Sequence, residues 1–151
     1  MTVYDAARFS WQKHKGQMYG DKDYFTHHIQ KVVSSLEVSV DRYKLTECEV
    51  DTILITAYLH DVVEDCGVTI KEIEDTFGVE VATYVSLLTK KPEQTRDDYL
   101  QQVSSCRVSA LVKLHDATIN ATQCFSDGDM KRFKKYLGYI GVLADKLGDV
   151  K

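Results

Sequence analysis

Turn-forming residues are scarce in this chain, whose 151 residues include one proline and eight glycines. A sandwich or barrel of short strands needs a turn about every 8–12 residues, so the composition argues against both. Apolar residues recur instead at spacings of three and four, as they do on one face of an α-helix. One such stripe consists of Ile29, Val32, Val33, Leu36 and Val40. The sequence therefore predicts an all-α fold, a bundle of about seven or eight helices.

Capping signals mark several of the expected helix starts. Thr46 with Glu49, and Thr69 with Glu72, have the three-residue spacing of a capping box. Thr26 is a candidate N-cap for the stripe that begins at Ile29. The helix that follows Thr46 is apolar nearly all round up to the doublet at positions 60 and 61, so we expect it to be central in the bundle.

The length fits a single domain, residues 1–151, without repeats or linker-like stretches. Lys and Arg number 19 and Asp and Glu number 23, and this net charge of −4 disfavours nucleic acid as a partner. No run approaches the roughly 18 apolar residues of a membrane span. Asp5 and Arg8 interrupt the place of a secretory signal, so we expect a cytoplasmic protein with no membrane partner. The four cysteines lack CxxC spacing and are expected to be reduced thiols.

Good ligands for a divalent metal ion lie on or beside three of the apolar helices. They are a histidine at position 27 or 28, the doublet His60-Asp61, and Asp116. A buried carboxylate without a partner costs several kcal/mol, and no cationic side chain flanks the doublet, so a metal ion would supply the partner. Two imidazoles and two carboxylates suit Mn²⁺, Fe²⁺ or another borderline ion. His27 and His28 point about 100° apart on a helix, so only one should face the ion.

This pattern resembles the H…HD…D signature of the HD-domain metal-dependent phosphohydrolases. The run His60-Asp61-Val62-Val63-Glu64-Asp65 is similar to the hydrolase domain of the RelA/SpoT homologues, including the small metazoan SpoT-like enzymes. The similarity extends to three other segments, Lys13-His14-Lys15-Gly16-Gln17, Tyr24-Phe25-Thr26-His27 and Val112-Lys113-Leu114-His115-Asp116 to Asn120.

The resemblance implies an Mn²⁺-dependent hydrolase that removes the 3′-pyrophosphate from guanosine 3′,5′-bis(diphosphate) (ppGpp) or from pppGpp. It also implies that His27, His60, Asp61 and Asp116 hold the ion, with Fe²⁺ or Zn²⁺ as alternatives to Mn²⁺. The choice of His27 over His28 comes from this resemblance alone. The expected partner is a small nucleotide, and the oligomeric state is left open.

The resemblance further implies that Glu64 and Asp65 position and deprotonate the attacking water, and that Asn120 contacts the nucleotide. If the helix continues through Asp65, Glu64 lies four residues beyond His60 and Asp65 four beyond Asp61. Both acids would then project from the face that carries the metal ligands.

The chain departs from the family in residues expected to recognise the substrate. Met18-Tyr19 stands where the family usually carries Arg-Lys, and His115 stands where it has Ala. Tyr19 is a candidate for stacking on a base, and Lys15 and Lys22 are candidate replacements for the lost charge. Two alternatives therefore stay open: hydrolysis of another nucleotide, such as removal of the 2′-phosphate of NADPH, and a nucleotide-binding module without turnover. The Glu64-Asp65 pair disfavours the binding module.

Overall fold

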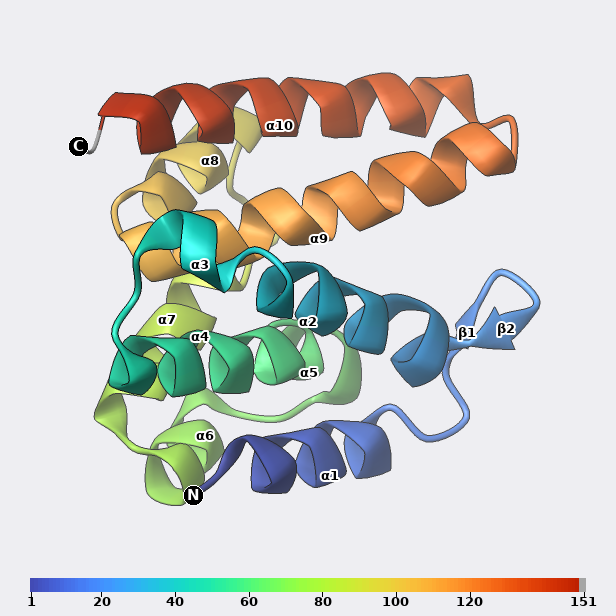
Figure 1. Cartoon of the computed structure of the whole chain (residues 1–151). Helices are drawn as coiled ribbons and strands as arrows, with labels where there is room; N and C mark the ends of the chain where they lie inside the picture. Colours follow the sequence, from blue (N-terminus) through green and yellow to red (C-terminus); the bar gives the residue numbers. More distant parts are fainter. Residues whose placement is uncertain (150–151) are drawn as a thin grey trace.

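A computed structural model describes residues 1–149, and these form the predicted all-α architecture (Figure 1). The N-terminal part consists of α1 (Val3–Lys13), the strands β1 (Met18–Tyr19) and β2 (Lys22–Asp23), the π-helical turn η1 (Phe25–Ile29), α2 (Gln30–Glu37) and α3 (Val40–Tyr43). The middle part consists of α4 (Glu47–Leu59), α5 (Val62–Cys66), α6 (Ile70–Phe77) and α7 (Val79–Leu88). The last part consists of α8 (Arg96–Ser104), α9 (Arg107–Ser126) and α10 (Met130–Asp149).

The predicted helices match the longer elements of the structure. Helices α3 and α5, of 4 and 5 residues, are additional short turns that the apolar periodicity does not reveal. The capping box of Thr46 and Glu49 is present at the start of α4, and the Thr69 side chain accepts the Glu72 N–H at the start of α6. The caps were readable because each depends only on residues three positions apart.

Helix α4 is central, as its composition predicts. Its residues Ile53, Ala57 and Leu59 are fully buried. It contacts α1 on one side and α2, α7 and α9 on others, so it has no wide solvent-facing stripe. Thus the end of α4, where His60 and Asp61 lie, is fixed in the middle of the molecule.

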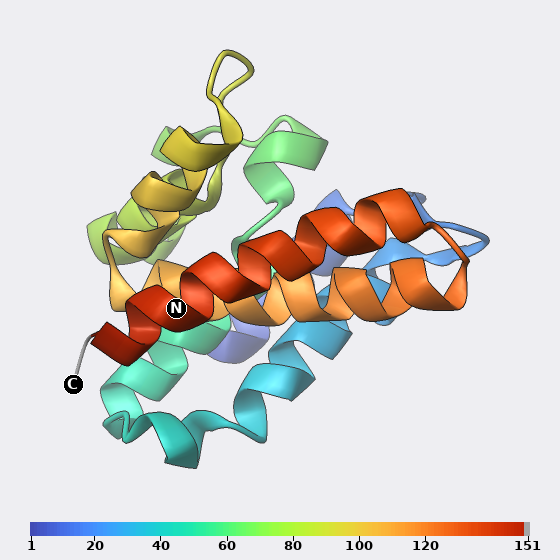
Figure 2. The same cartoon turned by 90° about the horizontal axis from the view of Figure 1, so that it is seen from above.

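The two longest helices form an antiparallel pair. Helices α9 and α10 lie side by side near the tight turn at Gly128 that joins them and diverge toward their other ends, where α8 packs against both (Figures 1 and 2). Three residues of α10 are buried in the hydrophobic core, together with residues of α8 and α9: Tyr136, Tyr139 and Leu143. The pairing brings the first half of α10 next to the second half of α9.

The segment between α1 and α2 differs from the expectation of a loop followed by a helix capped by Thr26. Met18–Tyr19 and Lys22–Asp23 form a small antiparallel hairpin, turned at Gly20, whose φ of 65° is left-handed. Thr26 lies inside η1 and is not its cap. The carboxylate of Asp23 instead accepts the Thr26 N–H at 2.8 Å.

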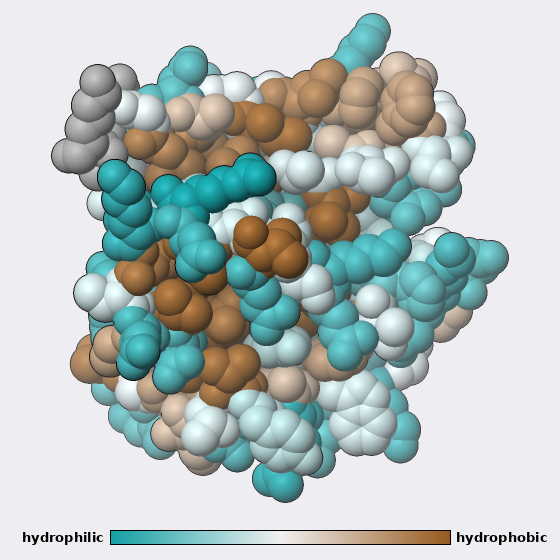
Figure 3. Space-filling model, in the orientation of Figure 1, coloured by the Kyte–Doolittle hydropathy of each residue, from teal (hydrophilic) through white to brown (hydrophobic). Residues whose placement is uncertain are grey.

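Hydrophilic side chains cover much of the surface seen in Figure 3, with hydrophobic ones gathered near its middle and along α10. Among the described residues, no helix is both long and apolar enough to cross a membrane. All four cysteines are free, as expected.

Candidate metal centre and pocket

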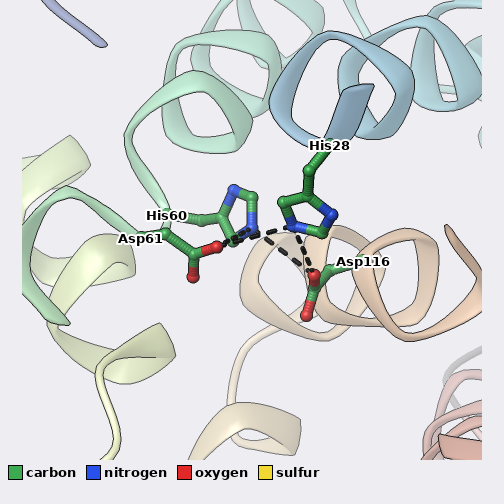
Figure 4. Close-up of side chains that lie close together, drawn as sticks. All are labelled: His28, His60, Asp61 and Asp116. Atoms are coloured by element: carbon green, nitrogen blue, oxygen red, sulfur yellow. Dashed lines mark ion pairs between the residues drawn. The ribbon is translucent and has the colours of Figure 1, made fainter. Parts of the chain in front are cut away.

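Four side chains from three segments of the chain converge at the centre of the fold. His28 comes from η1, His60 from the residue after α4, Asp61 from the residue before α5, and Asp116 from the middle of α9 (Figure 4). One nitrogen or oxygen of each residue lies within 4.8 Å of the corresponding atoms of the other three. The predicted meeting of two imidazoles and two carboxylates is therefore present in the fold.

The contacts between these groups are close. His28 Nε2 lies 3.1 Å from Asp116 Oδ1 and 3.5 Å from Asp61 Oδ2. His60 Nε2 lies 3.0 Å from Asp61 Oδ2 and 3.5 Å from Asp116 Oδ1. Both imidazoles thus direct Nε2 at the same two carboxylate oxygens.

Unpartnered nitrogens show that this group fits a metal ion. His60 Nδ1 lies 2.7 Å from the Ala57 carbonyl, which can only accept, so Nδ1 carries the proton and Nε2 presents its lone pair. His60 Nε2 and both ring nitrogens of His28 are buried and have no hydrogen-bond partner among the described residues. Buried polar atoms normally have a partner. A divalent cation coordinated by Nε2 of each ring would supply one.

The electrostatics of the group favour positive charge at its centre. Burial alone would lower the pKa of both histidines, but the neighbouring carboxylates outweigh it, raising the pKa of His28 and raising that of His60 further. Burial alone would raise the pKa of both carboxyls. His60 holds the pKa of Asp61 well below its usual range, and the Lys113 ammonium does the same for Asp116. A proton or a metal cation can supply the charge that the two carboxylates attract.

The two carboxylates are held by neighbouring side chains. Tyr24 donates its hydroxyl to Asp61 Oδ2 at 2.5 Å. Asn120 Nδ2 donates to Asp116 Oδ1 at 2.8 Å, and Lys113 Nζ lies 2.7 Å from Asp116 Oδ2. Such outer contacts fix the direction in which a carboxylate presents its lone pairs to an ion.

The choice of His27 as a ligand is wrong, because the structure brings His28 to the group instead. The His28 side chain is 1% exposed, whereas His27 is partly exposed and its Nδ1 lies 3.2 Å from the Asp23 carbonyl. The stripe of buried apolar residues in α2 already indicated that His28, and not His27, faces the core. His28 lies four residues before Val32 and eight before Leu36, both buried, whereas His27 lies four residues before the exposed Lys31.

The expectation for Glu64 and Asp65 assumed one helix that continues through Asp65. The structure has two helices instead. Helix α4 ends at Leu59, and α5 begins only at Val62. Glu64 and Asp65 nevertheless face the same pocket as Asp61. Glu64 accepts the backbone N–H of Lys90, and Asp65 accepts the Gln17 side-chain amide at 2.8 Å. Burial raises the pKa of Glu64.

A cavity of about 270 Å³ opens beside the metal-ligand group. Asn120 and Tyr19 lie on its wall, whereas Lys22 is exposed on β2 and does not line it. Its lining residues are Tyr19, Tyr24, Asp61, Glu64, Asp65, Lys90, Tyr99, Lys113, Asp116, Asn120, Arg132, Lys135, Tyr136 and Tyr139.

Most of the positive charge in this cavity comes from residues other than the predicted Lys22. Lys90, Lys113, Arg132 and Lys135 all line it, although the sequence suggested Lys22. Burial, together with the nearby Lys113, Arg132 and Lys90, lowers the pKa of Lys135. The four cations therefore act on one another across the cavity. No local pattern could reveal this, because the antiparallel packing of α10 on α9 brings them together.

His115, the residue before Asp116, points away from the metal-ligand group. Its Nδ1 lies 2.6 Å from Ser35 Oγ and its Nε2 lies 2.7 Å from Tyr43 Oη. The ring thus ties α9 to α2 and α3 and is itself buried.

This burial predicts a pH dependence of stability. Burial lowers the pKa of His115, so below the ordinary value of about 6.5 the unfolded chain binds a proton that the folded chain resists. This contribution to the free energy of unfolding is therefore constant above about pH 6.5 and falls as the pH drops below it. We expect His115→Gln, measured by urea unfolding between about pH 7.5 and 5.5, to show a weaker pH dependence than the wild type. An unchanged slope would contradict the assignment.

Comparisons with known proteins find similar sequences and a similar fold. No family model matches the chain. The guanosine-3′,5′-bis(diphosphate) 3′-pyrophosphohydrolase MESH1 of Danio rerio is 28% identical over 144 residues, covering 89% of this chain and 78% of that protein. The protein of the same name from Mus musculus is 31% identical over 121 residues, covering 77% of this chain and 65% of that protein.

A solved structure, described as a metazoan orthologue of SpoT that hydrolyses ppGpp, has the same fold. It matches with a TM-score of 0.76 at 22% sequence identity, over 96% of this chain and 84% of that one. The chain is thus similar in sequence to two MESH1 proteins and similar in fold to the metazoan orthologue of SpoT.

Proposed function

We propose that this chain is a metal-dependent hydrolase that removes the 3′-pyrophosphate from ppGpp. Both relatives reported above are named after this activity. The observation that carries the proposal is the convergence of His28, His60, Asp61 and Asp116 beside a cavity that holds both acidic and cationic side chains. A site for phosphoryl hydrolysis needs these three kinds of group together.

The four converging residues would hold the divalent cation, for which we propose Mn²⁺, with Fe²⁺ or Zn²⁺ as alternatives. Their mixed nitrogen and oxygen set suits such an ion and leaves positions for water and substrate. When bound, the ion lowers the pKa of a water molecule and neutralises charge on phosphoryl oxygens.

Glu64 is the proposed general base. Its raised pKa makes the carboxylate a better proton acceptor than an ordinary glutamate, and its contact with the Lys90 N–H fixes its position in the cavity. Asp65, held by the amide of Gln17, would orient the water.

The cationic side chains would bind the remaining phosphate groups. Lys113 pairs with Asp116, but Lys90, Arg132 and Lys135 form no ion pair with any carboxylate of residues 1–148. Three uncompensated cations that share a cavity repel one another, and a polyanion would relieve that repulsion. A nucleotide with several phosphates fits this charge distribution.

A substrate panel tests the proposal. The purified chain with Mn²⁺ is offered ppGpp, pppGpp, NADPH and the common nucleoside triphosphates, and released phosphate and pyrophosphate are measured. We expect pyrophosphate from ppGpp, and its loss in Asp61→Ala. Turnover of NADPH alone would replace ppGpp hydrolysis with 2′-phosphate removal. Tight ppGpp binding without turnover would indicate a binding module.

The cationic wall makes a separate prediction. Arg132→Gln removes one contact to a phosphate, and a charged hydrogen bond contributes about 1.5–3 kcal/mol, so we expect the KM for ppGpp to rise about 10-fold or more. Lys131→Gln is the matched control, because Lys131 is exposed and does not line the cavity. Steady-state kinetics that show the same KM in both variants would remove Arg132 from the binding site.

A further inference from the structure

A chain of hydrogen bonds connects the β1–β2 hairpin to the metal-ligand group. Tyr19, on β1, donates its hydroxyl to Asn120 Oδ1 at 2.8 Å. Asn120 Nδ2 in turn donates to Asp116 Oδ1 at 2.8 Å. That same oxygen lies 3.1 Å from His28 Nε2, so it is the one that faces the centre of the group.

The direction of each bond in this chain is determined. A carboxylate can only accept, so the Asn120 amide must turn its nitrogen toward Asp116 and its oxygen toward Tyr19. The Tyr19 phenol is then the donor. Burial raises the pKa of Tyr19, so the phenol keeps its proton. With Lys113 at Oδ2, both oxygens of Asp116 have assigned partners.

The Tyr19 ring is also fixed in place. Its centroid lies 5.0 Å from that of the His28 imidazole and 5.7 Å from that of Tyr24, with the two tyrosine rings nearly perpendicular. Tyr24 orients Asp61 directly. Thus both carboxylates of the metal-ligand group take part of their orientation from tyrosines in the segment of residues 19–24.

We propose that Tyr19 is a positioning residue for the metal ligand Asp116 and acts through Asn120. A hydrogen bond received at the amide oxygen polarises the amide and strengthens the bond that its nitrogen donates. This differs from the base-stacking role expected from the sequence, because the hydroxyl is engaged inside the cavity wall. The inference rests on the proposed function only in requiring that the four residues bind a divalent cation.

The test measures Mn²⁺ affinity by calorimetric titration, without any nucleotide. Loss of a direct outer partner costs roughly 10–100-fold in metal affinity, and Tyr19 acts one bond further out, so we expect Tyr19→Phe to weaken binding about 5-fold. Tyr84→Phe is the matched control. It removes a hydroxyl whose partner is the exposed Glu80, and it should leave the affinity unchanged.

A double-mutant cycle separates positioning from a general structural effect. If Tyr19 acts through Asn120, Tyr19→Phe will have no further effect on Mn²⁺ affinity in an Asn120→Ala background. Additive effects, or an unchanged affinity in Tyr19→Phe, would overturn the proposal. Urea unfolding of the metal-free variants checks the fold. If Tyr19→Phe does not fold, an unchanged Mn²⁺ affinity in Asn120→Ala overturns the proposal instead.

The outcome is independent of the substrate. Should the chain bind Mn²⁺ but fail to hydrolyse ppGpp, the proposed function fails while the cycle still decides the role of Tyr19.

Discussion

Replacing His28 with alanine is expected to abolish both metal binding and hydrolysis, whereas His27→Ala should leave both close to the wild type. His28 directs Nε2 at the carboxylates of Asp61 and Asp116, and its ring is buried. His27 Nδ1 instead lies 3.2 Å from the backbone carbonyl of Asp23. We expect His28→Ala to lower kcat/KM for ppGpp by roughly 10³-fold or more, which corresponds to about 4 kcal/mol of transition-state stabilisation.

Two measurements separate a loss of metal from a loss of fold. Mn²⁺ affinity is titrated in the wild type and both variants, and the free energy of unfolding is measured without metal. His28→Ala should lose the affinity and also some stability, because the buried ring lies between two carboxylates, and a cooperative urea transition will show that the variant still folds. Loss of metal binding in His27→Ala, with His28→Ala unaffected, would show that the arrangement of η1 is not the functional one.

These adjacent histidines show how far the sequence determines the site. His60, Asp61 and Asp116 could be predicted because a doublet at the end of an apolar helix and an acid on another apolar helix must both lie near the core. The choice between His27 and His28 depends on how the chain enters α2. Residues 25–29 form a π-helical turn, which the resemblance to a family does not indicate, whereas the buried stripe at Val32 and Leu36 does.

The fold shows the same division between local and long-range information. The position of α4 and its capping box follow from residues that are neighbours in the sequence. The β1–β2 hairpin has only two residues in each strand, too few for an alternating pattern. Arg132 and Lys135 reach the cavity only because α10 folds back along α9, so their role depends on tertiary packing.

Glu64→Gln is expected to lower kcat for ppGpp by about 10²–10⁴-fold, the usual contribution of a positioned general base. Glutamine keeps an oxygen that can accept the Lys90 N–H, so the side chain should stay in place while it loses the ability to take a proton. KM and Mn²⁺ affinity should therefore change little. Glu93→Gln, on the exposed α7–α8 connection, is the matched control and should retain wild-type kcat.

The comparison with Asp65→Asn assigns the two acids. Asp65 accepts an amide hydrogen bond from Gln17, which asparagine can also accept, so Asp65→Asn should keep the geometry as well. If Glu64 takes the proton and Asp65 orients the water, Glu64→Gln will reduce kcat more than Asp65→Asn. The opposite order would identify Asp65 as the general base. The comparison is direct because each variant keeps an oxygen that accepts a hydrogen bond and loses only the charge and basicity of the carboxylate.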